Sequence, residues 1–162
     1  MRSVHPMPVE QQLTKHFKLS EFTRSKKAID LGIDNTPSND VIIRLTQLAE
    51  KVLEPLRAHF GLPVKITSGF RCPALNSKVG GSNTSQHLLG EAADIKIPGV
   101  PNVEVWKYIK DNLPYDQLIA EYLRQDDDTA GWVHVSLRAV KNRQEAKSCI
   151  GKGRYPMGLH FV

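Results

Sequence analysis

The sequence predicts an α+β fold, in which N-terminal helices pack on a small antiparallel sheet. Apolar residues at three- and four-residue spacing between positions 41 and 56 predict a long amphipathic helix. Alternating apolar and polar residues predict later strands at 64–67, 93–97, 117–122 and 132–137. The chain contains no internal repeat or low-complexity linker. We therefore expect a single domain over residues 16–162, after a flexible lead over residues 1–15.

Capping residues, prolines and glycines mark the expected ends of the helices. Ser20 is expected to cap a short first helix that runs through Ala28. The long helix is expected to begin at residues 37–38. Pro55 should kink or end it, because proline lacks an amide hydrogen and its ring clashes with the preceding turn. Gly61 should then close it.

The second half of the chain is expected to form most of the sheet. A turn at residues 98–101 follows the second predicted strand, and Asn102 is expected to cap a helix after that turn. The strands 117–122 and 132–137 are expected to be neighbours, joined through the acidic loop 126–128.

Composition narrows the class of protein without identifying a function. With 40% hydrophobic and 24% charged residues, the chain is not wholly disordered, collagen-like or a disulfide scaffold. Its 22 Lys and Arg against 17 Asp and Glu give a net charge of +5, which favours anionic surroundings. The basic residues are scattered and form no stripe interleaved with aromatic residues, so we expect no nucleic-acid partner.

The apolar segments also bear on location. No apolar run approaches the roughly 18 residues that cross a bilayer. The first residues lack the apolar stretch of a secretory signal. We therefore expect no membrane insertion and a chain that is cytoplasmic as synthesised. In that reducing compartment Cys72 and Cys149 are expected to be free thiols, and we expect a monomer.

Two histidines and one aspartate form a candidate metal site. His87 precedes Asp94 by seven residues, and Asp94 lies on the predicted strand 93–97. An acid on a half-buried strand is costly without a compensating partner, and a metal ion is one such partner. Period two places His134 on the face of its strand that points away from the core. Two imidazoles and a carboxylate suit a catalytic zinc ion, although a lone histidine on a sheet is more often a core or surface residue.

Three motifs occur in order along the chain, at 68–71 (SGFR), 85–94 (SQHLLGEAAD) and 132–136 (WVHVS). Together they resemble the zinc D-alanyl-D-alanine carboxypeptidase family, whose fold is shared with the hedgehog signalling domain. The resemblance implies that His87, Asp94 and His134 bind one zinc ion, and that Arg71 binds substrate or stabilises an oxyanion. Because the family includes bacterial peptidoglycan peptidases and phage endolysins, it also implies zinc-dependent hydrolysis of amide bonds in peptidoglycan stem peptides.

The expected catalytic base departs from the pattern of this family. Many relatives carry an acid three residues before the last histidine, where this chain has Gly131. We prefer Glu121 as the base, because a hairpin would set its strand beside the strand that carries His134. The acidic run 126–128 is the fallback. If none of these acids serves, the chain is a catalytically inactive zinc- or wall-binding module.

Other residues are candidates for binding substrate. The guanidinium group of Arg71 suits a substrate carboxylate or an oxyanion, but it equally suits a salt bridge to Asp94 or Glu91. Asp116 either orients a ligand histidine or is a turn residue. The remaining candidates for contact with substrate are Ser85, Trp132 and Ser136.

The resemblance leaves the bond and the setting open. The bond cut is a terminal D-Ala-D-Ala link, a cross-bridge or the bond between L-alanine and D-glutamate. Peptidoglycan lies outside the membrane, whereas no secretory signal is evident. Release through a phage-made membrane lesion would reconcile the two, so a phage lysin or phage structural peptidase is the favoured setting. A mis-called start or another export route would also reconcile them.

Overall fold

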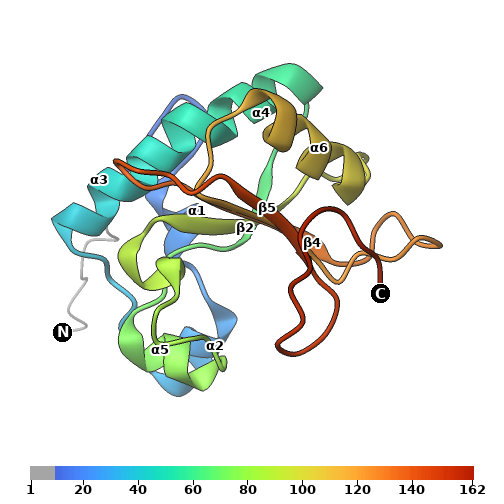
Figure 1. Cartoon of the computed structure of the whole chain (residues 1–162). Coiled ribbons are helices and arrows are strands. Elements are labelled where there is room, and N and C mark those ends of the chain that lie inside the picture. Colours follow the sequence, from blue (N-terminus) through green and yellow to red (C-terminus); the bar gives the residue numbers. More distant parts are fainter. Residues whose placement is uncertain (1–9) are drawn as a thin grey trace, which may run out of the picture.

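The computed structural model describes residues 10–162 and shows helices packed on a five-stranded sheet (Figure 1). The predicted α+β fold is confirmed. The strands are β1 (Lys65–Ser68), β2 (Ala92–Lys96), β3 (Gln117–Glu121), β4 (Trp132–Ser136) and β5 (Glu145–Cys149). The helical segments are α1 (Leu19–Thr23), α2 (Lys26–Leu31), α3 (Asn39–Leu48), η1 (Ala49–Leu53), α4 (Glu54–Phe60), α5 (Pro73–Lys78), η2 (Gln86–Leu89) and α6 (Asn102–Asn112).

The sheet places β4 at its centre, in the strand order β1-β2-β4-β3-β5. Neighbouring strands are antiparallel except for β5, which runs parallel to β3. The predicted pairing of β3 with β4 is confirmed. In this register His134 lies between Asp94 of β2 and Ile119 of β3.

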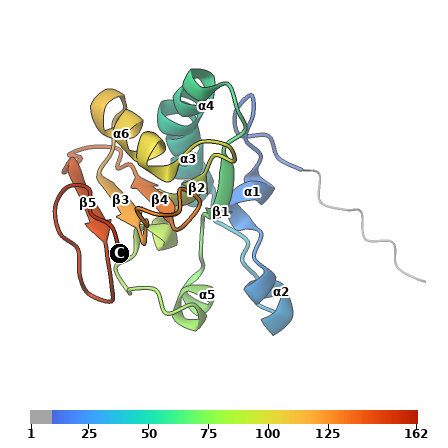
Figure 2. The ribbon, with the colours of Figure 1, turned by 90° about the vertical axis from the view of Figure 1, so that its right-hand side faces the viewer.

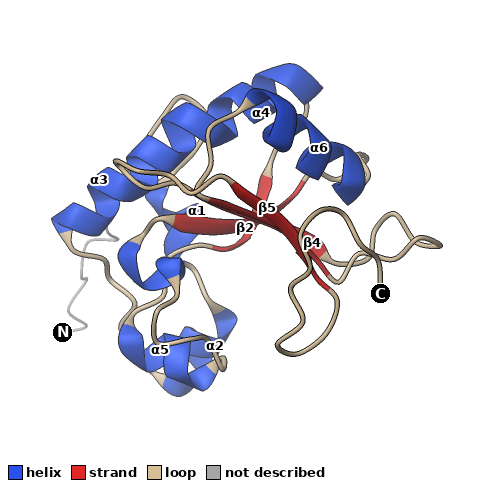
Figure 3. Ribbon diagram, in the orientation of Figure 1, coloured by secondary structure: helices blue, strands red, loops and turns tan. Residues whose placement is uncertain are grey.

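The two faces of the sheet have different surroundings. Helices α3, α4 and α6 cover one face, whereas α2 and α5 lie on the opposite side (Figures 1 and 3). A view turned by 90° shows the same division (Figure 2). The helix-covered face carries the core residues of the strands, among them Ile95, Leu118, Val133 and Val135. The polar residues that alternate with them therefore face the other side.

The first helical segment is broken, contrary to the prediction of one helix from Ser20 through Ala28. Helix α1 ends at Thr23, and α2 begins after Ser25, whose side chain accepts a hydrogen bond from the amide of Ala28. Ser20 lies inside α1, and its hydroxyl donates to the carboxylate of Glu10 at 2.5 Å. The prediction missed Ser25 as a second cap only five residues further on.

The long helix begins and ends as predicted but is not interrupted at Pro55. Ser38 caps α3, and Gly61 ends α4 in the left-handed conformation, at φ 65°. Between α3 and α4 the π-helical turn η1 continues the helix. Its wider turn relieves the clash that a proline ring makes with the carbonyl one turn earlier, so α4 proceeds through Pro55.

Asn102 does not cap α6, contrary to the prediction. Pro101 precedes the helix, and the amide nitrogen of the Asn102 side chain donates to the carbonyl oxygens of Ala130 and Gly131, at 3.0 and 3.2 Å. Asn102 thus ties the start of α6 to the residues just before β4. Helix α5 and strand β5 were not predicted.

The N-terminal residues and the two cysteines can be compared with their predictions. Residues 1–9 of the predicted lead lie outside the described residues. Within residues 10–15, Leu13 packs against the core, and the hydroxyl of Thr14 donates to Glu54 at 2.7 Å. Cys72 and Cys149 are both free thiols. No helix in the described part of the chain has the length and apolar character needed to span a bilayer.

Candidate metal centre and active site

His87, Asp94 and His134 come together on the open face of the sheet. His87 lies on the short turn η2, Asp94 on β2 and His134 on β4, where the two strand residues are register partners. One ligand atom from each residue lies within 4.8 Å of the others. The side chains are 3%, 14% and 10% exposed. The structure therefore brings the three predicted metal ligands into one half-closed cluster.

Glycines on both sides of His87 fix its position. Nδ1 of His87 lies 2.7 Å from the carbonyl oxygen of Gly69. A Cβ atom at Gly69 would lie 2.5 Å from the carbonyl oxygen of Phe22, so only glycine permits this close approach. Gly90 ends η2 at φ 73°, and a Cβ there would lie 2.7 Å from Cγ1 of Val41. Both motif glycines therefore hold the His87 turn against its neighbours.

The hydrogen bond to Gly69 determines which nitrogen of His87 is free. A carbonyl oxygen only accepts, so Nδ1 carries the proton, and in a neutral ring Nε2 then has a lone pair. Burial lowers the pKa of His87, which keeps the ring neutral at neutral pH. That Nε2 lies 3.4 Å from Oδ1 of Asp94. Two acceptors thus face each other, an arrangement that a cation between them would stabilise.

Asp94 is ionised in this cluster. Burial opposes its ionisation, but the neighbouring imidazoles, with the hydrogen bond from His134, outweigh burial and hold its pKa well below the ordinary value. Nδ1 of His134 lies 2.9 Å from Oδ1 of the same carboxylate. Two imidazole nitrogens and one carboxylate oxygen match the donor set of a catalytic zinc site, so these residues fit a zinc ion.

The cluster opens into a polar cavity of about 670 Å³. Seven of the predicted site residues line this cavity, namely Arg71, Ser85, His87, Asp94, Glu121, Trp132 and His134. Ser136 is fully buried, and its hydroxyl accepts a hydrogen bond from the amide of Gln117 at 3.0 Å. It is the last residue of β4, and this hydrogen bond ties β4 to the start of β3.

Glu121 is the last residue of β3. It follows Ile119, the register partner of His134, by two residues. It shares the cavity with the metal-ligand cluster. Burial raises the pKa of Glu121, and the negative charge of Asp94 raises it further. His134 and Arg71 lower this pKa, but the net shift is upward. An acid with a raised pKa beside a metal site is suited to accept and release a proton.

The structure explains why the acid of many relatives is replaced by Gly131. Gly131 has φ 71°, and a Cβ atom there would lie 2.1 Å from the carbonyl oxygen of Glu121 and 2.8 Å from the carbonyl oxygen of Tyr122. A side chain at position 131 is therefore incompatible with this close approach. The same contact brings the backbone of Glu121 next to the position where relatives carry the acid.

Replacing Gly131 with alanine should lower the free energy of unfolding by about 2 kcal/mol or more, from the left-handed backbone and the clash with Glu121 together. Gly153 is a matched control, because its φ is also 71° but a Cβ atom there meets nothing within 4 Å. Gly153→Ala should cost about 1–2 kcal/mol, from the backbone conformation alone. Urea denaturation of both variants measures the difference, and equal losses would contradict the clash.

Arg71 is free to meet a ligand. The predicted alternative, a salt bridge to Asp94 or Glu91, is not formed: neither acid lies within 4.0 Å of its nitrogens among the ion pairs of residues 10–162. Its backbone amide donates to the carbonyl oxygen of His87 at 3.1 Å, which anchors it beside the cluster. Burial lowers the pKa of Arg71, although a guanidinium keeps its proton throughout the physiological range.

The other predicted binding residues have structural contacts as well. The hydroxyl of Ser85 caps η2 by accepting from the amide of His87 at 3.3 Å. The ring of Trp132 lies 5.7 Å from that of Tyr122, in a tilted arrangement. Both side chains also line the cavity.

The remaining acids lie apart from the metal-ligand cluster. Asp126 pairs with Arg124 at 2.9 Å, and Asp127 accepts from Thr129 in the loop between β3 and β4. Asp116 contacts no ligand histidine: Arg138 and Arg143 are its ion-pair partners. Neither Asp116 nor the 126–128 run is part of the cavity lining.

Several cavity residues were not predicted, including Arg138, Arg143, Lys147 and Tyr155. Arg138 follows Ser136 by two residues, so extending the alternation one residue beyond the predicted strand 132–137 would have placed it on the face of His134. Arg143, Lys147 and Tyr155 had no comparable signal, because they lie in or around the unpredicted strand β5.

Comparison with known families decides the affiliation. A family model described as Peptidase M15 matches residues 15–136, more than half of the chain. The chain belongs to the M15 peptidases. The resemblance to the zinc D-alanyl-D-alanine carboxypeptidases is thereby confirmed, and with it a metallopeptidase classification. M15 peptidases are zinc-dependent, and the match includes all three residues of the cluster. No curated protein matches the chain.

Proposed function

We propose that this M15 peptidase hydrolyses amide bonds in peptidoglycan stem peptides, as a carboxypeptidase or endopeptidase. The observation that carries the proposal is the cluster of His87, Asp94 and His134 in a polar cavity that also contains Glu121 and Arg71. The lining of this cavity supplies three metal-ligating residues, an acid and a cation.

His87 and His134 would hold a zinc ion through ring nitrogens and Asp94 through a carboxylate oxygen. A bound zinc ion would supply Lewis-acid chemistry, polarising the scissile carbonyl and lowering the pKa of water. The bond from His87 Nδ1 to Gly69 orients that ring and fixes its tautomer. The protein thus presents a preformed site, with no rearrangement of the sheet required.

Glu121 serves as the general base in this proposal. It accepts a proton from the attacking water and passes it to the leaving amine. Its buried position at the end of β3 raises its pKa, which makes Glu121 a stronger acceptor of the proton from water. Arg71 donates hydrogen bonds to the substrate carboxylate or the developing oxyanion. Trp132 and Ser85, which also line the cavity, would contact the peptide.

We also propose where the enzyme acts. It would be made in the cytoplasm and reach the cell wall after phage-mediated release. The net charge of +5 supports it, because anionic wall polymers would retain a basic protein.

Digestion of purified sacculi, followed by mass spectrometry of the products, tests the proposal. We expect new amine and carboxyl ends at one type of stem-peptide bond, which also identifies that bond. A chelator should abolish release, and added zinc should restore it. Intact sacculi with the zinc-loaded protein would contradict hydrolysis and favour the alternative.

That alternative is a catalytically inactive module that binds zinc or the wall. The observation that favours it is Gly131, since the acid of many relatives is missing and cannot be accommodated there. An inactive module would bind sacculi and zinc without releasing any fragment.

A further inference from the structure

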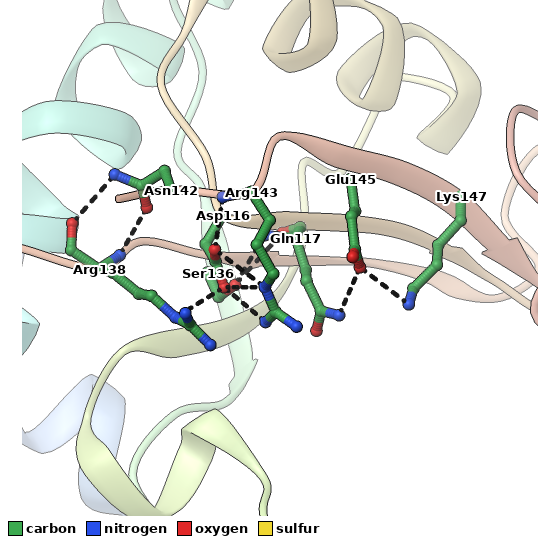
Figure 4. Close-up of polar contacts among 8 residues, drawn as sticks. All are labelled: Asp116, Gln117, Ser136, Arg138, Asn142, Arg143, Glu145 and Lys147. Carbon is green, nitrogen blue, oxygen red and sulfur yellow. Dashed lines mark hydrogen bonds and ion pairs between the residues drawn. The ribbon is translucent and has the colours of Figure 1, made fainter. Parts of the chain in front are cut away.

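A cluster of charged residues lies at the end of the cavity formed by the start of β3 and the loop after β4. Asp116 is fully buried and accepts from Arg143 at Nη2 (2.7 Å), at Nε (3.2 Å) and at the backbone amide (2.8 Å). Nε of Arg138 lies 3.2 Å from the same carboxylate. Figure 4 shows the two guanidinium groups converging on Asp116.

The charges in this cluster do not balance. One carboxylate neutralises only one of the two guanidinium groups. The next acid, Glu145, is already bound by Gln117 at 2.9 Å and by Lys147 at 3.3 Å (Figure 4). Within residues 10–162, neither Glu145 nor Glu91 forms an ion pair with Arg138 or Arg143. Counted by ion pairs, one positive charge is therefore left over at this end of the cavity, and the carboxylates of Glu145 and Glu91 act on Arg143 only from beyond ion-pair distance.

The excess charge is accessible. The side chains of Arg138 and Arg143 are 40% and 38% exposed, and both line the cavity. In the described part of the chain, both Nη atoms of Arg138 and Nη1 of Arg143 have no hydrogen-bond partner. A purely structural clamp on the buried Asp116 needs only Arg143. Arg138 adds repulsion between like charges, which an arriving anion would relieve.

The strand register gives the approximate distance between the arginine pair and the metal-ligand residue His134. Ile119 is the register partner of His134, and Asp116 precedes Ile119 by three residues. At about 3.3 Å per strand residue, the arginine pair lies roughly 10 Å from His134 along the strand. Glu121 lies in the opposite direction along β3. An extended peptide covers roughly 10 Å in about three residues.

We propose that Arg138 and Arg143 form a carboxylate-binding subsite that selects acidic peptides. Its ligand is a carboxylate two or three residues from the scissile amide. The planar guanidinium fork matches a carboxylate in a bidentate arrangement, and two such groups on one side of a cavity favour an anion over a neutral amide. This inference rests on the proposed function, because it presupposes that a peptide is cut at the metal-ligand cluster.

The test uses zinc-loaded full-length protein and matched stem peptides, in which each carboxylate near the cut bond is replaced in turn by a carboxamide. One replacement should lower kcat/KM roughly 10- to 100-fold, which corresponds to the loss of a hydrogen-bonded charge. Arg138→Gln should bring the ratio of kcat/KM between acid and amide peptides close to one. The buried Asp116 keeps Arg143 in this variant, so the fold is preserved, and the thermal unfolding midpoint checks this.

Lys107→Gln is the matched control. Lys107 is an exposed residue of α6, on the face of the sheet opposite the cavity, and its replacement removes the same unit of charge. It should leave the ratio as in the parent protein. A ratio that fell equally in Lys107→Gln would assign the preference to net charge and overturn the subsite.

The outcomes also separate this inference from the proposed function. Cleavage of acid and amide peptides at equal rates would overturn the subsite and leave the peptidase standing. If no peptide is cut, the proposed function fails, and calorimetric titration of the same peptides then decides the subsite by itself. Weaker binding of one amide to the parent but not to Arg138→Gln supports the subsite, and equal binding of all peptides rejects it.

Discussion

Replacing Glu121 with glutamine should lower kcat for stem-peptide hydrolysis roughly 10²- to 10⁴-fold, the range for loss of a general base. Glutamine has nearly the same shape but cannot accept a proton from water. Glu121 is not one of the three clustered metal ligands, so the variant should still bind one zinc ion per chain. Metal analysis and steady-state kinetics on the same preparation separate the two effects.

Asp126→Asn is the matched control for Glu121→Gln. Asp126 is the exposed partner of Arg124 in the loop after β3 and belongs to the acidic run 126–128, the fallback base that the sequence predicts. Its replacement should leave kcat within about twofold of the parent. If Asp126→Asn were inactive and Glu121→Gln active, the assignment of the base would be reversed. Full activity in both variants would mean that neither acid takes the proton.

Local sequence patterns predicted most of the fold because they reflect local physics. The three- and four-residue spacing from Val41 to Leu56 identified the long helix, and alternation identified β4 with its buried Val133 and Val135. Strand β5 was missed because its sequence, EAKSC, has no β-branched or aromatic residue. Its parallel pairing with β3 depends on contacts distant in sequence, which no local pattern contains.

The candidate site was predictable only in part, for a related reason. Alternation along single strands places Asp94 and His134 on defined faces, but only the register of β2 with β4 makes them partners. The backbone contact between Gly131 and Glu121 involves two segments joined by a loop, so its steric demand is visible only in three dimensions. The role of Asp116 could not be assigned from sequence, because its partner Arg143 lies 27 residues further along the chain, beyond the central strand β4.

Replacing His134 with alanine should lower zinc affinity by more than the 10- to 100-fold that loss of an outer-shell partner typically costs. The variant lacks one of the three ligand atoms that lie within 4.8 Å of one another. Two remaining ligands, His87 and Asp94, cannot complete the three-ligand set of a catalytic zinc site. Hydrolysis at a zinc concentration that saturates the parent should fall to background.

The control for His134→Ala is His160→Ala, because His160 is exposed and its ring contacts only the carbonyl oxygen of Met157, at 2.8 Å, among its side-chain hydrogen bonds in the described chain. Zinc should raise the thermal unfolding midpoint of the parent and of His160→Ala, since a ligand that binds the folded state stabilises it. It should not raise the midpoint of His134→Ala. An equal zinc-dependent rise in all three proteins would place the metal elsewhere. Because this readout needs no substrate, it tests the metal site even if the bond that the enzyme cuts is not the one proposed.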